Sequence, residues 1–205
     1  MIVTTTVDRR VTADASNVLV PAIVAKIGDV TSDSVTLISD ALSAAEDAGQ
    51  SVLPLEIDSS GGDVYALLGM LDVIKSSRVQ VATICVGRAF SAGAVLLACG
   101  GAPGLRWVAP RATVMVHDAW DRNSAPQKVD ESEANARELK RLGRKIAALM
   151  DRSAGKPRGT IASLVHERSH VDVYLRPAEV VGLGLADRVG LPSLRVRVGV
   201  EYELS

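Results

Sequence analysis

Residues 51–94 read SVLPLEIDSSGGDVYALLGMLDVIKSSRVQVATICVGRAFSAGA, and this stretch decides the fold class. Ser51–Ile57 has the pattern of a strand, and Val79–Val86 is a continuous apolar run typical of a strand that is buried on both faces. Between these runs, after the pair Gly61–Gly62, apolar residues recur at helical spacing. They are Val64, Leu67, Leu68, Leu71 and Ile74. A strand, a helix and a second strand joined by short turns predict a parallel sheet covered by helices.

The same alternation extends from this stretch in both directions. On the N-terminal side, Asn17–Ile27 is expected to form a buried strand that Pro21 interrupts. The helix that follows is expected to begin at Thr31–Asp33 and to end at Gly49. On the C-terminal side, Gly87 is expected to end the strand that precedes it. The later expected elements are a small-residue helix over 91–99, strands over 105–108 and 112–117, a charged helix over 128–152, a helix capped by Thr160, a short helix from Pro177, and a half-buried strand over 193–204.

Composition limits the kind of protein that this chain can be. The 205 residues are 47% apolar and 23% charged, with 23 basic and 24 acidic side chains. This length and apolar content suit one folded domain over residues 1–205 and exclude a disordered chain. The balanced charge predicts no binding to nucleic acid or an anionic membrane, and no apolar run reaches the roughly 18–20 residues of a membrane span. Cys85 and Cys99 fit neither a zinc site nor a disulfide framework, so the cytoplasm is the expected location.

Three places hold residues that could carry out chemistry. Ser91 follows a buried strand and begins a helix, where free N–H groups favour negative charge, although a serine at this position is more often a helix cap. His117 ends a strand, where catalytic groups gather in open α/β sheets, but it could also be a simple polar terminus. In the turn Asp58–Asp63, the N–H groups exposed by Gly61–Gly62 could bind an oxyanion, and the turn could equally have no function.

Taken together, these residues indicate acyl transfer. That reaction needs a hydroxyl, a base, a group that orients the base and two N–H donors. The orienting group is expected to be a carboxylate, and Asp172, which precedes a short strand, is the natural candidate. Asp118 adjoins His117 directly, but neighbouring residues on a strand point to opposite faces, so Asp118 is the poorer candidate.

Four stretches, in this order along the chain, resemble motifs of the proteolytic subunit of Clp proteases, in the ClpP/crotonase superfamily. The stretches are IDSSGGDVY at 57–65, TICVGRAFSAGA at 83–94, VMVH at 114–117, and DVYL at 172–175 followed by AE at 178–179 and GLAD at 184–187. They are similar, respectively, to the family's glycine turn, its nucleophile segment, the strand that carries its base and the region that supplies its acid. The resemblance extends from about Gly28 to Val189.

This resemblance implies a role for each matching residue. Ser91 would be the nucleophile, His117 the general base and Asp172 the group that orients the base. The backbone N–H groups of Gly62 and Ala92 would form the oxyanion hole. The implied activity is that of a serine endopeptidase that acts on polypeptides and needs no metal or organic cofactor.

The resemblance also implies an architecture and an assembly. The fold would consist of repeated β-α-β units with a mostly parallel sheet, an N-terminal segment over 1–16, a protruding handle region over 118–153 and a C-terminal strand extension over 190–205. The chain would form a homo-oligomer of stacked rings whose sites face an inner chamber. In a monomer, the apolar stripe of the handle helix is expected to be only partly covered. The stripe consists of Leu139, Leu142, Ile146, Leu149 and Met150.

Departures from the family pattern leave alternatives open. Ser60 replaces the usual proline of the glycine turn. Asp118–Trp120 follows the histidine in an order similar to that of the capsid-maturation proteases of tailed phages, which is the alternative function within the family. The strand over 52–57 has no aromatic residue of the kind that helps ClpP to dock an AAA+ unfoldase, so coupling to such a partner is an open question.

Three other function classes compete with a Ser-His-Asp peptidase. One is a catalytically inactive ring subunit. Another is a Ser–Lys peptidase with Lys128, Lys140 or Lys145 as its base, although these lysines are expected to be solvated on a charged helix face. The last is a crotonase-type coenzyme A enzyme, which shares the fold but does not need a Ser-His-Asp set.

Overall fold

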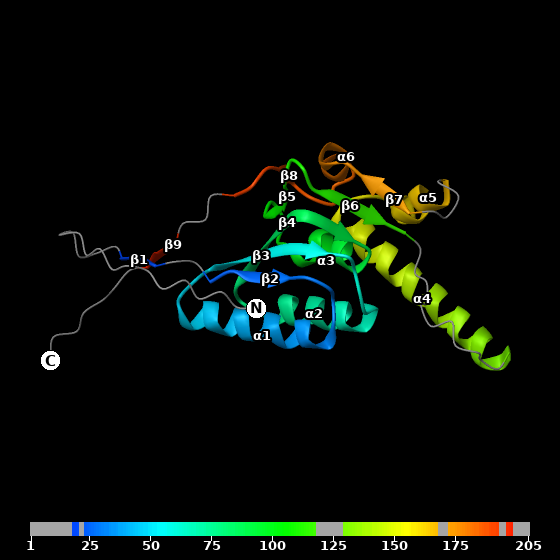
Figure 1. Ribbon diagram of the computed structural model, residues 1–205, viewed down its shortest axis with the longest axis horizontal. Helices are drawn as coiled ribbons and strands as arrows, with labels where there is room; N and C mark the ends of the chain where they lie inside the picture. Colours follow the sequence, from blue (N-terminus) through cyan, green and yellow to red (C-terminus); the bar gives the residue numbers. More distant parts are fainter. Residues whose placement is uncertain (1–17, 21–22, 118–128, 168–171, 193–195, 199–205) are drawn as a thin grey trace.

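The structure is a computed structural model and describes residues 18–20, 23–117, 129–167, 172–192 and 196–198. Within these residues, the centre of the fold is a seven-stranded sheet (Figure 1). Its strands are β2 (Ala25–Ile27), β3 (Val52–Ser59), β4 (Gln80–Phe90), β5 (Arg106–Val108), β6 (Thr113–Val116), β7 (Val173–Leu175) and β8 (Arg188–Val189). The strand order is β2-β3-β4-β5-β8, while β6 pairs with β4 and with β7. Only β6 and β7 pair in antiparallel fashion within this sheet, so the predicted mostly parallel sheet is confirmed.

Helices cover the sheet in the order that the sequence predicts. The helices of the described residues are α1 (Ser32–Asp47), α2 (Val64–Ser76), α3 (Ala92–Gly100), α4 (Val129–Ser153), α5 (Thr160–Glu167) and α6 (Pro177–Gly182). Figure 1 shows α1 and α2 side by side along one face of the sheet, whereas α4 projects from the body of the molecule. Thr31 is the N-cap of α1 and Pro177 lies in the first turn of α6, as expected.

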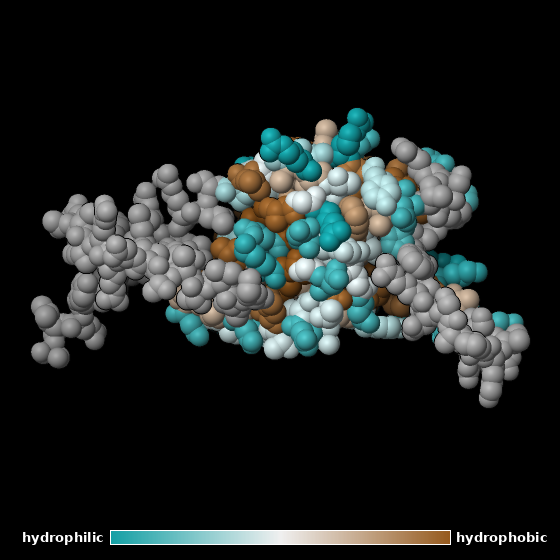
Figure 2. Space-filling model, viewed as in Figure 1, coloured by the Kyte–Doolittle hydropathy of each residue, from teal (hydrophilic) through white to brown (hydrophobic). Residues whose placement is uncertain are grey.

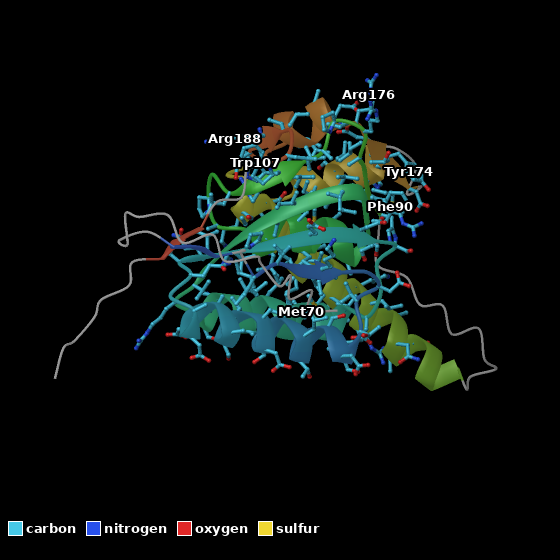
Figure 3. The ribbon with its side chains drawn as sticks, turned by 60° about the vertical axis from the view of Figure 1, so that its left-hand side comes forward. Met70, Phe90, Trp107, Tyr174, Arg176 and Arg188 are labelled. Carbon is cyan, nitrogen blue, oxygen red and sulfur yellow. The ribbon has the colours of Figure 1, made fainter. Side chains whose placement is uncertain are left out.

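The core lies between the sheet and the helices α1, α2 and α3. Aliphatic side chains and methionine fill it, and Met70 of α2 is one of the fully buried residues (Figure 3). The largest fully buried side chains also include Ile38, Leu53, Leu55, Ile57, Leu67, Leu96 and Leu97. Burial of each such side chain stabilises the folded state by about 1.5–3 kcal/mol. Some apolar side chains remain visible on the surface (Figure 2), and Tyr65, Tyr174, Val189 and Leu191 are the large ones described as exposed.

Gly87 does not end β4, contrary to the prediction. The strand continues to Phe90, because glycine tolerates the positive φ of 85° at this position. Before Gly87, the segment Thr83–Cys85 pairs with β5, and after it the segment Arg88–Phe90 pairs with β6. The bend therefore lets one strand serve two partners and carries the chain to the start of α3.

The segment Asn17–Ile27 is not one interrupted strand. Its first part, β1 (Val18–Val20), pairs in antiparallel fashion with β9 (Val196–Val198), and its last part is β2, which pairs with β3. The Gln50 side chain holds the chain just before β2 by bonding both the N–H and the carbonyl oxygen of Ile23. Of the predicted C-terminal strand over 193–204, β9 is the part that the structure describes, and the N-terminal segment 1–16 lies outside the described residues.

A helix, α4, covers most of the predicted handle region, its role as a handle stays a prediction, and residues 118–128 lie outside the described residues. Its apolar stripe is partly covered, as expected, with Leu142 and Met150 only 4% and 2% exposed. Its main packing partners are α3 and α5. The other three residues of the stripe, Leu139, Ile146 and Leu149, are half-buried. No described helix is both long and apolar enough to cross a membrane.

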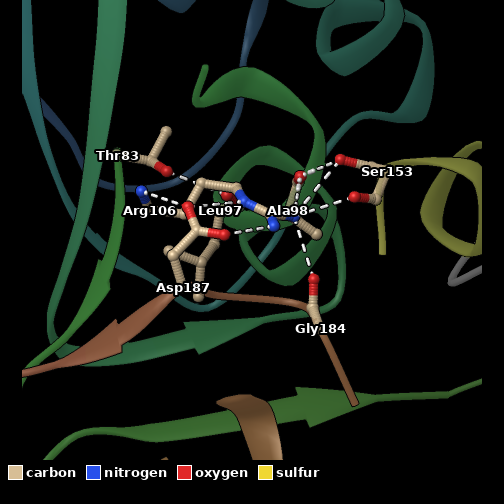
Figure 4. A network of polar contacts seen from close by, with 7 residues as sticks. All are labelled: Thr83, Leu97, Ala98, Arg106, Ser153, Gly184 and Asp187. Carbon is tan, nitrogen blue, oxygen red and sulfur yellow. Dashed lines mark hydrogen bonds and ion pairs between the residues drawn. The ribbon is translucent and has the colours of Figure 1, made fainter. Parts of the chain in front are cut away.

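A buried arginine ties the C-terminal half of the chain to the core (Figure 4). The Arg106 guanidinium donates to both carboxylate oxygens of Asp187, at 3.1 and 2.5 Å. It also donates to the carbonyl oxygens of Ala98, Ser153 and Gly184 at 2.9–3.2 Å. Burial opposes ionisation of Asp187, but the hydrogen bonds and charge of Arg106 outweigh it and lower the pKa of this carboxyl.

Asp151 joins α4 to α5. Its carboxylate is almost fully buried and accepts hydrogen bonds from the N–H groups of Gly159 and Ile161, at 2.7 and 2.9 Å. These donors lie at the N-terminus of α5, where a negative charge is favoured. Thr160, which was expected to cap this helix, instead donates its hydroxyl to the Pro157 carbonyl oxygen.

Candidate active site

Ser91 stands at the turn between β4 and α3. Its N–H donates to the Met115 carbonyl oxygen of β6 at 2.9 Å, and its own carbonyl oxygen accepts from the N–H groups of Ala94 and Val95. Among the described residues other than glycine, only Ser91 has a positive φ, of 52°. A backbone of this kind costs about 1–3 kcal/mol and persists only where its surroundings enforce it. The turn therefore presents the Ser91 side chain from a fixed backbone.

The glycine turn predicted as an oxyanion site packs directly on this serine. A Cβ at Gly61 would lie 2.8 Å from the Cβ of Ser91, and one at Gly62 would lie 2.2 Å from the Val30 carbonyl oxygen. The φ angles of the two glycines are 110° and 143°. Both the space and the backbone angles therefore require glycine at these positions. Ser59, which is fully buried, supports the turn by accepting a hydrogen bond from the Gly61 N–H at 3.0 Å.

The two backbone N–H groups predicted to bind an oxyanion belong to Gly62 and Ala92. Val30 donates its N–H to the Gly61 carbonyl oxygen and accepts from the Asp63 N–H, both at 2.8 Å. This bridge uses the groups on either side of Gly62, so the Gly62 N–H takes no part in it. Ala92 is the first residue of α3, where an N–H finds no acceptor inside the helix. Their action as an oxyanion hole remains a prediction.

The pairing of β4 with β6 brings His117 close to Ser91 along the sheet. Phe90 lies opposite Met115 in this parallel pair. Ser91 directly follows Phe90 at the end of β4. His117 follows β6, two residues after Met115. Both side chains line the same pocket.

The pairing of β6 with β7 brings Asp172 to the same end of the sheet. Val116 lies opposite Val173 in this antiparallel pair. Because the strands run in opposite directions, the next residues outward are His117 on one strand and Asp172 on the other. Asp172 is exposed and accepts a hydrogen bond at 3.5 Å from the hydroxyl of Tyr174.

An apolar pocket of about 520 Å³ opens beside Ser91 and His117. Its walls come from the N-terminal parts of α2 and α3, the end of β6, the middle of α4 and the helix α5. The residues that line it besides Ser91 and His117 are Val64, Leu67, Ala92, Val95, Val116, Ala136, Leu139, Lys140, Gly143, Arg144, Ile146, Ala147, Met150, Ile161, Ala162 and Val165. Small and aliphatic side chains dominate this list, so the pocket suits an apolar side chain of a substrate.

The lysines proposed as alternative bases are separated by the structure. Lys140 lines the pocket beside Ser91, whereas Lys145 lines a different pocket between α2, α3 and α4. Lys128 lies outside the described residues. His166 is exposed in the last turn of α5, and His170 lies outside the described residues.

The sequence reasoning missed the far wall of the pocket. Ile161, Ala162 and Val165 of α5 lie about seventy residues along the chain from Ser91, and Gly143 of α4 lies about fifty residues from it. The one available signal was the helical spacing of three small residues of α4, Ala136, Gly143 and Ala147. That spacing does not by itself show what the helix packs against.

The thiols are unsuited to act as nucleophiles. Burial raises the pKa of the Cys85 thiol to about 12, with a smaller contribution from the Asp58 charge. Burial likewise raises the pKa of Cys99 to about 12. Since the thiolate is the reactive form, both groups are inert at neutral pH. Within the described ranges, no three His, Cys, Asp or Glu residues gather in a way that could hold a metal ion.

The fold and the site together define an α/β protein with a serine held at a strand-to-helix turn against a glycine loop. The model of the Clp protease family matches residues 7–192. The chain therefore belongs to the Clp protease family, and the resemblance noted from the sequence is confirmed.

Relatives with the same family name match the chain at moderate identity. Proteolytic subunit 3 of the chloroplastic ATP-dependent Clp protease of Arabidopsis thaliana is 33% identical over 177 residues, which are 85% of this chain and 54% of the relative. The proteolytic subunit of Dehalococcoides mccartyi is 35% identical and proteolytic subunit 1 of Corynebacterium glutamicum is 34% identical, each over 67% of this chain. The matches span only 54–65% of the relatives' own lengths.

Proposed function

We propose that this chain is a serine endopeptidase in which Ser91 is the nucleophile, His117 the general base and Asp172 the group that orients the base. The strand register carries this proposal. β6, which leads to His117, lies between β4, which leads to Ser91, and β7, which Asp172 precedes. Family membership supports the same reaction class.

In the proposed reaction, His117 takes the Ser91 hydroxyl proton as the oxygen bonds to the carbonyl carbon of a peptide. The carbonyl oxygen becomes negatively charged, and the N–H groups of Gly62 and Ala92 stabilise that charge. His117 then gives the proton to the leaving amine, and an ester to Ser91 remains. A water molecule that His117 deprotonates hydrolyses the ester and restores the serine. Asp172 stabilises the protonated imidazole, and no metal or organic cofactor takes part.

The proposed substrates are polypeptides with an apolar side chain on the acyl side of the cleaved bond. Such a side chain would enter the pocket of about 520 Å³ beside Ser91. The walls facing this pocket are largely aliphatic, so a charged side chain would lose hydration there, and the cations of the lining, Lys140 and Arg144, offer a partner only to an acidic one.

The proposed assembly is a homo-oligomer of stacked rings, as the family implies. The projecting helix α4 supports it, because such a helix offers a surface to another copy (Figure 1). Coupling to an AAA+ unfoldase is left to experiment. A cytoplasmic location is proposed because Cys85 and Cys99 are both free thiols.

A fluorophosphonate probe with mass analysis of the intact chain tests the reaction, and native mass spectrometry of the same sample tests the assembly. The expected result is one adduct per subunit in the wild type, none in Ser91→Ala, and an unchanged adduct in the exposed-serine control Ser76→Ala. A wild type that takes up no probe while it assembles into rings would instead indicate an inactive ring subunit.

One observation favours a second candidate within the same reaction class. Lys140 lines the pocket that Ser91 and His117 share, so a Ser–Lys mechanism has a base available. The capsid-maturation alternative depends on residues 118–120, which lie outside the described residues.

A further inference from the structure

A tyrosine of α2 is hydrogen-bonded to the projecting helix α4. The Tyr65 hydroxyl donates to Glu138 Oε1 at 2.8 Å. Arg141, one turn further along α4, donates to both oxygens of the same carboxylate, at 2.6 and 2.7 Å. A guanidinium that binds a carboxylate through two parallel bonds fixes its orientation, so the carboxylate is held toward Tyr65.

These contacts lie where α4 leaves the body of the molecule. The side chains of residues 133–137 are all exposed, whereas Glu138 is half-buried and Leu142 is 4% exposed. The main packing partners of α4 are α3 and α5, and its backbone makes little contact with α2. A side-chain hydrogen bond to α2 at this point therefore restrains α4 where its packing against the body of the protein begins.

The same contacts bridge two walls of the pocket beside Ser91. Val64, the neighbour of Tyr65, lines the pocket from α2. Leu139 and Lys140, which directly follow Glu138, line it from α4. The distance between α2 and α4 sets the width of the pocket here, and the Tyr65–Glu138 hydrogen bond spans that distance.

We propose that Tyr65, Glu138 and Arg141 form a latch that holds α4 against the N-terminal turn of α2 and thereby limits the size of the substrate side chain that the pocket admits. The three residues are positioning residues and do not touch the reacting atoms. The effect on substrate choice rests on the proposed function, whereas the mechanical effect on α4 does not.

The carboxylate of the latch stays ionised under ordinary conditions. The hydrogen bonds from Arg141, and next from Tyr65, lower the pKa of Glu138 to about 2. The pKa of Tyr65 is raised, mainly by its hydrogen bond to Glu138. A neutral hydroxyl facing a carboxylate is the arrangement that the hydrogen bond requires.

Amide hydrogen exchange tests the latch and does not depend on catalytic activity. It is measured on the whole protein and followed over residues 139–147. Tyr65→Phe removes only the hydroxyl and is expected to raise exchange there about fivefold. Glu138→Gln should raise exchange at least as much, because it also weakens the pair with Arg141, and adding Tyr65→Phe to it should raise exchange by less than Tyr65→Phe does in the wild type. The matched control is Glu133→Gln, which breaks an exposed pair with Arg137 on the same helix and should leave this segment unchanged. Unchanged exchange in Tyr65→Phe overturns the latch.

The effect on substrate choice is measured with peptides that carry leucine or alanine at the acyl side of the cleaved bond. In Tyr65→Phe, the ratio of their kcat/KM values should change at least threefold through KM, with kcat for the alanine peptide nearly constant. Faster exchange with an unchanged ratio overturns the proposed size limit alone. A wild type that cleaves neither peptide overturns the proposed function and with it the size limit, while hydrogen exchange still decides whether the latch exists.

Discussion

Gly61 lies against Ser91 so closely that a Cβ on the glycine would be 2.8 Å from the Cβ of the serine. The same added atom would lie 3.2 Å from the Phe90 carbonyl oxygen. The glycine turn and the strand-to-helix turn therefore fit together as one unit, although thirty residues of chain separate them. Any change that widens this contact displaces the proposed nucleophile relative to the proposed donors.

Gly61→Ala is expected to reduce kcat/KM at least about 100-fold, because a shift of about 1 Å at a reacting group has effects of that size. Gly104→Ala is the matched control. Gly104 also has a positive φ, of 82°, but a Cβ there would meet nothing within 4 Å. The control should therefore lose about 1–2 kcal/mol of stability from backbone strain and keep its activity. Equal losses of activity in both variants would show that strain, and not the contact with Ser91, causes the effect.

His117→Ala should lower kcat by about three or more orders of magnitude, as expected for a residue that acts as a unit with the nucleophile. Lys140→Ala should change kcat less than about threefold, because this lysine is exposed and is not needed as a base in the proposed mechanism. Steady-state hydrolysis of a fluorogenic peptide compares the two variants. An active His117→Ala with an inactive Lys140→Ala would assign the protein to the Ser–Lys class.

Gly143→Leu should reduce kcat/KM for a peptide with a bulky apolar residue at least about tenfold more than for its alanine counterpart. Gly143 lines the pocket beside Ser91, so a leucine there takes up part of its volume. Glycine is also a poor residue inside a helix, and the replacement should not lower the stability of α4. Ala134→Leu, at an exposed position of the same helix, is the control and should leave the preference unchanged.

Local patterns predicted the repeating unit of the fold. The apolar run over 79–86 and the helical spacing that follows Gly61–Gly62 depend on neighbours in the sequence, and both correspond to the observed β4 and α2. The place of Ser91 at the turn between β4 and α3 followed from the same local reading. Its role in catalysis came from the family resemblance and stays a prediction.

Features that depend on distant contacts could not be predicted. The sequence shows that Gly87 can bend the chain, but only the availability of β6 as a partner explains why β4 continues to Phe90. The burial of Leu142 depends on α3 and α5, whose position relative to α4 no periodicity specifies. For the same reason Asp151 was not recognised as the residue that caps α5.

The last prediction concerns acid stability and the buried pair of Arg106 and Asp187. Asp187→Asn removes the charge that balances Arg106, a residue only 7% exposed, so it should lower the free energy of unfolding by about 3 kcal/mol at pH 7. Glu46→Gln, which breaks an exposed pair with Arg78 at 4.0 Å, should change it by less than about 0.5 kcal/mol. Urea unfolding of the three proteins measures both differences.

The dependence on pH follows from the lowered pKa of Asp187. In the unfolded chain this carboxyl titrates near its ordinary pKa of about 3.9. In the folded protein it gives up its charge only at a lower pH, so folding favours the ionised form. The stability that it contributes is therefore complete above about pH 5 and is lost as the pH falls through the folded pKa.

The difference in unfolding free energy between the wild type and Asp187→Asn should be constant from pH 7 to 5 and should shrink between pH 4 and 2. A difference that instead grew in acid would mean that the carboxyl is held in its neutral form, and the ion pair with Arg106 would not be what joins these elements.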